Sequence, residues 1–274
     1  LCCILPFILL IASSFSSEAD LTKYGYSFIP RGFTLAAYKY IWAIKENILR
    51  AYGMSFLITG IGTVINLVMT LLFAYPLSRK DLPGRKWISF FLFFTMLFNG
   101  GFVPTYLIYS NVFHITDTLA AMIVPYLLMN AFYVIMMRTY IMTNVPMEVI
   151  EASMIDGANE FQNLARIVVP MSKPIIGTIG LMSAIAYWNN WTNGIYFIQS
   201  RRNLYGIQNY LNSVISNVAF LQTHSVGSGI VTADLPSISI RMALAVIAII
   251  PVLVAYPFFQ KSFVAGITVG SVKG

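Results

Sequence analysis

Charge is scarce in this sequence. Only 10% of its 274 residues are charged, whereas 58% are hydrophobic, and the mean hydropathy is +0.74. A soluble domain carries about 25% charged residues. A chain with so few charges could not cover a globular surface, so the composition excludes the soluble class and predicts a protein that has lipid as its solvent.

Cysteine and histidine are nearly absent as well. Cys2 and Cys3 are adjacent in an apolar run, and His114 and His224 are isolated from one another and lack a Cys/His/carboxylate cluster around them. A disulfide framework needs spaced partners, and a metal site needs three or four converging ligands. We therefore expect neither a disulfide nor a bound metal in this chain.

The phosphate-binding loop of ATPases is missing too. That loop requires Gly, four residues, then Gly-Lys-Ser/Thr, and the dipeptide Gly-Lys occurs nowhere in the sequence. No apolar segment carries a His/Asp/Glu or Ser/His constellation for acid–base or nucleophilic chemistry. We expect no catalytic residue and no cofactor in this chain.

The formal net charge of +7 raises the question of nucleic acid. The basic residues lie in short connecting segments rather than along one stripe. That distribution favours contact with anionic lipid headgroups. We expect a lipid bilayer and no nucleic acid among the partners.

Long apolar runs are what the sequence has in abundance. A membrane helix needs roughly 20 apolar residues, and five segments satisfy that length. A shorter run at the beginning is interpreted as the rest of a first span, in preference to a cleaved signal peptide. The six predicted spans are residues 1–15, 54–78, 87–109, 119–137, 174–198 and 242–260. The predicted fold class is an all-α integral membrane protein, with residues 1–274 forming one multi-pass domain.

Basic residues beside the spans predict the orientation. The short loop at residues 79–86 carries four Lys and Arg residues, whereas the short loop after the third span carries none. Short loops rich in Lys and Arg stay in the cytoplasm. Alternation then makes residues 142–173 cytoplasmic and makes residues 16–53 and 199–240 extracellular.

The five complete spans contain no Asp, Glu, Lys, Arg or His. Ion-coupled carriers usually keep such groups within the membrane, so their absence argues against proton or sodium coupling and against a charged substrate. The spans hold Asn, Tyr and Trp instead. These side chains either bridge helices and anchor at the interface, or line a path for a hydroxyl-rich solute. The best candidates for such a path are Tyr187, Trp188, Asn189, Asn190 and Trp191.

Residues 142–173 form an unusually long loop, and four of the ten acidic residues lie in it. Pro146 suits the first position of a short helix, and Gly157 suits a left-handed cap at its end. A second helix should begin at about Asn159 and end near Pro170. A helix lying on the bilayer surface would be rich in Lys and Arg, so the acidity of the loop favours docking to a partner instead.

This loop resembles the "EAA" loop of ABC-importer permease subunits. The family pattern is Glu-Ala-Ala, three residues, Gly, nine residues, Ile, one residue, Leu-Pro; the chain reads EASMIDG, nine residues, then IVVP. Ser replaces the second Ala and Val replaces Leu, which are small or isosteric departures. In the family this loop forms coupling helices that sit in a groove of a cytoplasmic ATPase. The resemblance assigns ATPase coupling to Glu151, Ala152, Ser153, Asp156, Gly157, Ile167 and Pro170.

The likeness extends beyond the loop. The sequence AYPLSR at residues 74–79, the pair Trp188-Asn189 and the tail at residues 256–274 resemble MalG-like permeases of maltose-type sugar importers. Residues 232–236 resemble the subgroup that takes complex plant or host oligosaccharides. The resemblance implies a MetI-like fold and the import of an oligosaccharide.

The same resemblance implies the partners. They are a second homologous permease subunit, two copies of a cytoplasmic ABC ATPase that bind ATP and Mg²⁺, and an extracellular sugar-binding protein, all at a bacterial cell membrane. An ABC-importer permease for a peptide or an amino acid is an alternative within this class. A secondary carrier or channel and a membrane-embedded enzyme are alternatives from other classes.

Overall fold

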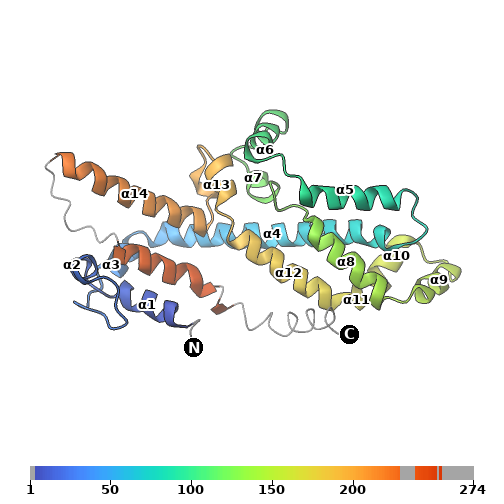
Figure 1. The fold of residues 1–274 in the computed structure, drawn as a ribbon, viewed down its shortest axis with the longest axis horizontal. Coiled ribbons are helices and arrows are strands. Elements are labelled where there is room, and N and C mark those ends of the chain that lie inside the picture. The colour runs from blue at the N-terminus through green and yellow to red at the C-terminus, as the bar shows by residue number, and fades with distance from the viewer. Residues whose placement is uncertain (1–3, 229–237, 252, 255–274) are drawn as a thin grey trace. The chain divides into compact units, whose positions relative to one another are not determined.

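The computed structural model describes residues 4–228, 238–251 and 253–254, and every regular element within them is a helix (Figure 1). The chain divides into two compact units. The first contains the described residues of Leu1–Ser55 and Arg202–Tyr256, and the second contains those of Phe56–Arg201. The predicted tail at residues 256–274 and the stretch at residues 232–236 lie outside the described residues, as do parts of the first and last predicted spans.

The first unit is built from short helices and the beginning of a long one. Its elements are α1 (Leu5–Ser14), α2 (Glu18–Tyr24), α3 (Ala36–Ala43), the start of α4 (Lys45–Ser78), a 3-10 turn (Arg202–Leu204), α14 (Ile207–Ser228) and a helix at Ile238–Pro251. The Glu18 carboxylate accepts hydrogen bonds from the backbone N–H groups of Ile238, at 2.9 and 3.0 Å, and Ser239, at 3.1 Å. A negative charge at a helix N-terminus is stabilising, so α2 holds the start of the last described helix.

The second unit contains the rest of α4 and the remaining helices. They are α5 (Arg85–Leu97), α6 (Phe102–Leu107), a π-helix (Ile108–Val112), α7 (Leu119–Ile123), α8 (Ala131–Asn144), α9 (Met147–Ile155), α10 (Glu160–Asn163), a π-helix (Leu164–Val168), α11 (Val169–Met171), α12 (Lys173–Trp188) and α13 (Thr192–Phe197). In this unit α8 contacts both α5 and α12, and α13 contacts α7.

Among the described residues, α4 alone is a single helix long and apolar enough to cross a membrane. Two further candidates are bent pairs: Arg85–Leu97 with Phe102–Val112, at 115°, and Glu160–Met171 with Lys173–Trp188, at 83°. Leu5–Ser14 and Ile238–Pro251 are shorter apolar helices. The structure thus has between one and three full-length candidates in its described part, where hydropathy predicts six spans.

The predicted spans at residues 87–109, 119–137 and 174–198 are not continuous helices, and the last of them is interrupted between α12 and α13. The first is interrupted between α5 and α6, where Gly101 has φ +84° and its N–H bonds to the Asn99 side chain at 2.9 Å. The second is interrupted between α7 and α8, where Tyr126 has φ +65°. Positive φ cannot be continued as a right-handed helix, so the chain turns at both places although its residues remain largely apolar.

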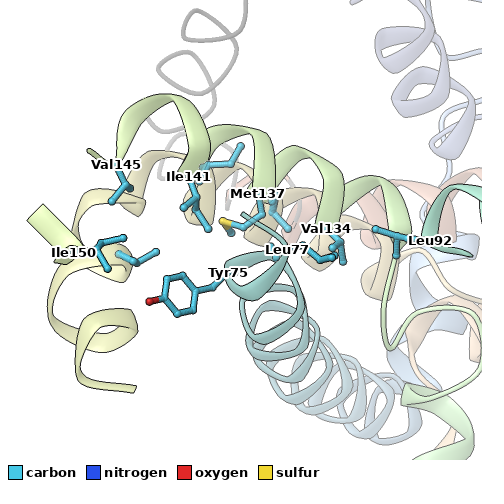
Figure 2. Packing of buried hydrophobic residues seen from close by; sticks show 12 residues of the cluster. Tyr75, Leu77, Leu92, Val134, Met137, Ile141, Val145 and Ile150 are labelled. Carbon is cyan, nitrogen blue, oxygen red and sulfur yellow. The ribbon is translucent and has the colours of Figure 1, made fainter. Parts of the chain in front are cut away.

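One buried cluster joins the C-terminal end of α4 to α8 and α9 (Figure 2). Leu77 from α4, Met137 and Ile141 from α8, and Ile150 from α9 are each at most 2% exposed. Val168, from the segment that follows α10, belongs to the same cluster and is fully buried. Close packing in this cluster ties α9 to α4 and α8.

Candidate functional site

Residues 142–173 form a helical hairpin, which we call the 142–173 hairpin. Its first helix, α9, is preceded by Pro146, whose ψ of 132° is extended, so the helix begins one residue later than the sequence predicts. Gly157 follows the helix with φ +89°, and its N–H bonds to Met154 O at 3.1 Å. The expected left-handed break at Gly157 is therefore confirmed, and glycine suits it because it has no Cβ.

The second half of the hairpin begins where the sequence predicts. Asn159 caps α10 through its side-chain oxygen, which accepts from Gln162 N at 2.9 Å, while Gln162 Oε1 accepts from Asn159 N at 2.9 Å. This reciprocal capping box satisfies two N–H groups that a helix start leaves unpaired. The helical path continues to Met171, one residue beyond Pro170, and bends by 83° at Ser172.

Ser153 joins the two halves of the hairpin. Its hydroxyl lies 2.8 Å from the carbonyl oxygen of Ile150 and 2.5 Å from the side-chain oxygen of Asn163. The single hydroxyl proton serves one of these acceptors at a time. Asn163 is fully buried, and the sequence reasoning missed it because it lies outside the EAA pattern. The residue that departs from that pattern therefore makes a contact that alanine could not make.

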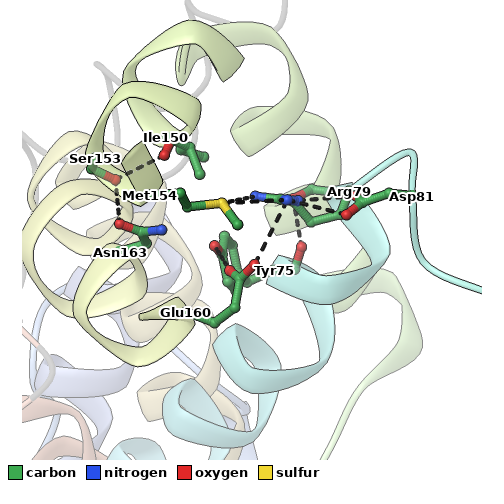
Figure 3. A network of polar contacts seen from close by, with 9 residues as sticks. Tyr75, Arg79, Asp81, Ile150, Ser153, Met154, Glu160 and Asn163 are labelled. Carbon is green, nitrogen blue, oxygen red and sulfur yellow. Dashed lines mark hydrogen bonds and ion pairs between the residues drawn. The ribbon is translucent and has the colours of Figure 1, made fainter. Parts of the chain in front are cut away.

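A polar network links the end of α4 to both halves of the hairpin (Figure 3). The Tyr75 hydroxyl donates to the Glu160 carboxylate, and the Arg79 guanidinium lies 3.6 Å from the same carboxylate. Both Nη atoms of Arg79 lie 3.8 Å from the Met154 sulfur. Arg79 also bonds Asp81 through two N–H groups at 3.1 Å, which lowers the pKa of the Asp81 carboxyl below its ordinary value.

The predicted coupling residues divide into an exposed and a packed group. Glu151, Ala152, Asp156, Gly157 and Pro170 are exposed. Ser153 and Ile167 are half-buried, and Ile167 packs against the core cluster. Their assignment to ATPase coupling stays a prediction.

Large apolar side chains stand at the exposed end of the hairpin. Ile155 is 87% exposed and Phe161 is 76% exposed. They flank the turn at Gly157, whereas Ile150 and Val168 hold the other end of the hairpin in the core. The hairpin therefore exposes apolar side chains at its tip while its base is buried.

Two of the predicted path residues are packed inside the second unit. Tyr187 is 3% exposed and donates its hydroxyl to Ile123 O at 3.1 Å. A Cβ added at Gly62 would lie 2.5 Å from the Tyr187 ring, so α4 and α12 meet closely here. Trp188 is 7% exposed, and its ring centroid lies 5.2 Å from that of Phe56.

The other three path residues are more accessible. Asn189 is exposed, Trp191 is 50% exposed, and Asn190 is half-buried. The Asn190 side-chain oxygen accepts a hydrogen bond from Asn193 N at 3.2 Å. Whether any of the five contacts a solute stays a prediction.

Side-chain amides satisfy the backbone where α7 and α8 are interrupted. Asn66 Nδ2 donates to Leu127 O at 2.8 Å, and Asn193 Nδ2 donates to Pro125 O at 3.0 Å. Non-helical backbone at membrane depth requires such partners, since lipid offers none. Broken helices in transporters often lie beside the transported solute, which makes this interruption a second candidate region.

Asp117 fixes the turn beyond the same helices. Its Oδ1 accepts backbone N–H groups from Gln199 at 2.8 Å, Ser200 at 2.9 Å and Arg201 at 3.1 Å. These bonds, with that from Arg201 the strongest cause, hold the pKa of the Asp117 carboxyl below its ordinary value. Sequence alone gave no signal for this contact, because the partners are backbone groups far along the chain.

Metal binding finds no support in the described part of the chain. No three His, Cys, Asp or Glu side chains gather there in a group that could hold a metal ion.

Helices throughout the described residues, apolar helices interrupted by turns and an acidic hairpin packed against α4 and α8 are features expected of membrane transport permeases. The family of binding-protein-dependent transport system inner membrane components matches residues 68–269, and the chain belongs to this family. The expected MetI-like permease fold is thereby confirmed.

Known proteins from bacteria are similar over the whole chain. LplC of Bacillus subtilis is 37% identical, over 99% of this chain and 90% of that protein. The polygalacturonan/rhamnogalacturonan transport system permease protein YtcP of the same organism is 37% identical, over 100% and 94%. A crystal structure of a bacterial ABC transporter involved in the import of the acidic polysaccharide alginate matches with a TM-score of 0.80 and 29% identity, covering 96% of this chain and 91% of that one.

Proposed function

We propose that this chain is one permease subunit of an ATP-driven importer that carries an oligosaccharide across a bacterial cell membrane. The similar permease YtcP is named for the transport of polygalacturonan or rhamnogalacturonan. The similar transporter of known structure is involved in the import of alginate. All three substrates are saccharide chains. The ionisable-free spans are consistent with energy from a partner rather than from an ion gradient.

The apolar tip of the 142–173 hairpin carries the proposal. Ile155, at 87% exposed, would be unfavourable in water in an isolated protein. Its surroundings include the exposed residues Glu151 and Asp156, so the surface combines an apolar knob with acidic groups. A cleft on a cytoplasmic ATPase with an apolar floor and basic rim fits this chemistry. Docking there would move α9, and the buried cluster would pass that movement to α4 and α8.

The proposed complex divides the work among its subunits. Two ATPase subunits bind ATP and Mg²⁺ and perform the hydrolysis, and this chain contributes no catalytic group. A second, homologous permease lies beside it, and an extracellular binding protein delivers the oligosaccharide. Closing of the ATPase pair would then switch the permeases between two rigid-body states.

Reconstitution tests the proposal. The chain is co-purified with its neighbouring permease and ATPase, placed in vesicles, and supplied with a binding protein and labelled oligosaccharides. Uptake should require hydrolysable ATP on the side of the vesicle membrane that carries the ATPase subunits. It should stop when a non-hydrolysable analogue replaces ATP. Uptake that a proton gradient drives without ATP would contradict the proposal and favour a secondary carrier, and uptake of peptides or amino acids alone would contradict the saccharide substrate.

A further inference from the structure

A cavity opens beside the interruption between α7 and α8. Its volume is about 490 Å³, and its walls come from α6, from the α7–α8 connection, from the end of α12 and from α13. Ligand pockets commonly measure about 300–1,000 Å³ and combine apolar walls with a few placed polar groups. The size of this cavity therefore suits a small organic ligand or one unit of a longer chain.

Aromatic rings contribute to the wall of the cavity. Phe102 and Tyr196 line it with ring centroids 4.0 Å apart and planes inclined at 45°. Tyr126 lines it as well, is 44% exposed, and has the positive φ described above. A bulky residue rarely adopts that backbone conformation, and here it brings an aromatic ring to the cavity wall at the point where the helix is broken.

Neutral hydrogen-bonding groups line the cavity as well. Asn190 and Thr192 line the cavity. Within the described residues, the Asn190 side-chain amino group and the Thr192 hydroxyl make no hydrogen bond. An amide offers donor and acceptor together, and a hydroxyl can serve as either. The lining residues include no Asp, Glu, Lys, Arg or His, so nothing in the wall would balance a charge on the ligand.

We propose that this cavity is a subsite on this permease for one uncharged, hydroxyl-rich sugar unit of the transported chain. The flat carbon face of the ring would lie against Tyr126, Phe102 or Tyr196, and ring hydroxyls would bond Asn190 and Thr192. A uronate unit would leave its carboxylate unpaired there. The inference deepens the proposed function and rests on it, because it assumes that a saccharide passes this chain.

Cysteine protection tests the subsite without relying on transport. Ala186 lines the cavity and is not one of the proposed ligand groups. Ala186→Cys is made after Cys2 and Cys3 are changed to serine, and the assembled complex is held in lipid nanodiscs. The rate of maleimide labelling is measured with the neutral tetrasaccharide stachyose or with trigalacturonic acid at equal concentration. An active ATPase in the same sample reports intact assembly.

Stachyose should slow labelling of the Ala186→Cys variant at least threefold, and trigalacturonic acid should slow it less. When Asn190→Leu is added to the Ala186→Cys variant, the stachyose concentration that gives half-maximal protection should rise about fivefold, as expected for one lost hydrogen bond. Asn111→Leu is the matched control, because Asn111 is exposed and is not a cavity residue. It should leave the protection unchanged.

Two results would overturn the subsite proposal. Equal or better protection by trigalacturonic acid would show that the cavity accepts charge, and no protection by either probe would show that the cavity is not a sugar site. The proposed function fails independently, if vesicles containing the complete complex show no ATP-dependent uptake of any oligosaccharide.

Discussion

Replacing Gly157 tests whether the turn of the 142–173 hairpin sets the coupling geometry. Its φ of +89° lies where an L-residue is strained, and a Cβ built there meets no atom within 4 Å. Gly157→Ala therefore adds a backbone cost and no steric clash within the described structure. That cost is about 1–2 kcal/mol, and about 1 kcal/mol changes a conformational ratio roughly fivefold.

The assay measures oligosaccharide uptake and ATP hydrolysis by the same reconstituted complex. Gly157→Ala should lower the number of molecules imported per ATP about fivefold, because a smaller fraction of the hairpins would hold the docking geometry. Gly157→Asn should lower the number of molecules imported per ATP by less than Gly157→Ala does, since Asn tolerates the left-handed region. Gly157→Val should lower that number by more. Gly84→Ala is the matched control: Gly84 has φ +72°, its Cβ would also meet nothing within 4 Å, and it lies outside the hairpin.

The transport-to-hydrolysis ratios of the Gly157 variants and of Gly84→Ala show whether the turn sets the docking geometry. If Ala, Asn and Val at position 157 all leave the transport-to-hydrolysis ratio at the wild-type value, the left-handed turn does not set the docking geometry. If Gly84→Ala lowers the ratio as much as Gly157→Ala, the loss reflects general destabilisation rather than coupling.

Three further outcomes are expected. Gly62→Ala should lower the melting temperature of the purified complex, with a cost of about 1–3 kcal/mol from the clash with Tyr187, whereas Gly60→Ala should not, because its Cβ meets nothing within 4 Å; equal melting temperatures would contradict the close approach. Asp117→Asn should melt below the wild type at pH 7, and the gap should close as pH falls below about 4, since a carboxyl with a lowered pKa stabilises the fold only while ionised; a gap independent of pH would refute the charge argument. Glu151→Lys should preserve ATP hydrolysis while reducing uptake per ATP, and an unchanged ratio would exclude Glu151 from the docking surface.

The 142–173 hairpin shows what local sequence can predict. Gly157 and the capping residue Asn159 act within a few positions of themselves, so their effect on the backbone is readable from the sequence. Pro146 was placed one residue too far into the helix, because proline fixes φ but leaves ψ free, and here ψ is extended. The ties from Tyr75 to Glu160 and from Ser153 to Asn163 depend on the fold and could not be predicted.

The interrupted spans show what a hydropathy pattern does not report. A break that keeps apolar residues on both sides does not change the composition, so residues 87–109 and 119–137 look like uninterrupted spans. Local signals did exist, since Asn99 and two glycines stand at the first break. What stabilises the second break are amides from Asn66 and Asn193, whose partners only the folded structure identifies. The same limit explains why the sequence could not show that Tyr187 is packed against α4, whereas its predicted role along a solute path stays a prediction.

The amide donors at the second break also constrain how the chain is made. Asn66 leaves the ribosome before the carbonyl of Leu127 that it bonds, but Asn193 and Tyr187 are synthesised well after Pro125 and Ile123. Until residue 193 has been synthesised, the carbonyl oxygens of Ile123 and Pro125 lack the donors that Tyr187 and Asn193 provide in the folded chain. The connection between α7 and α8 can therefore complete these hydrogen bonds only after residue 193 has been synthesised.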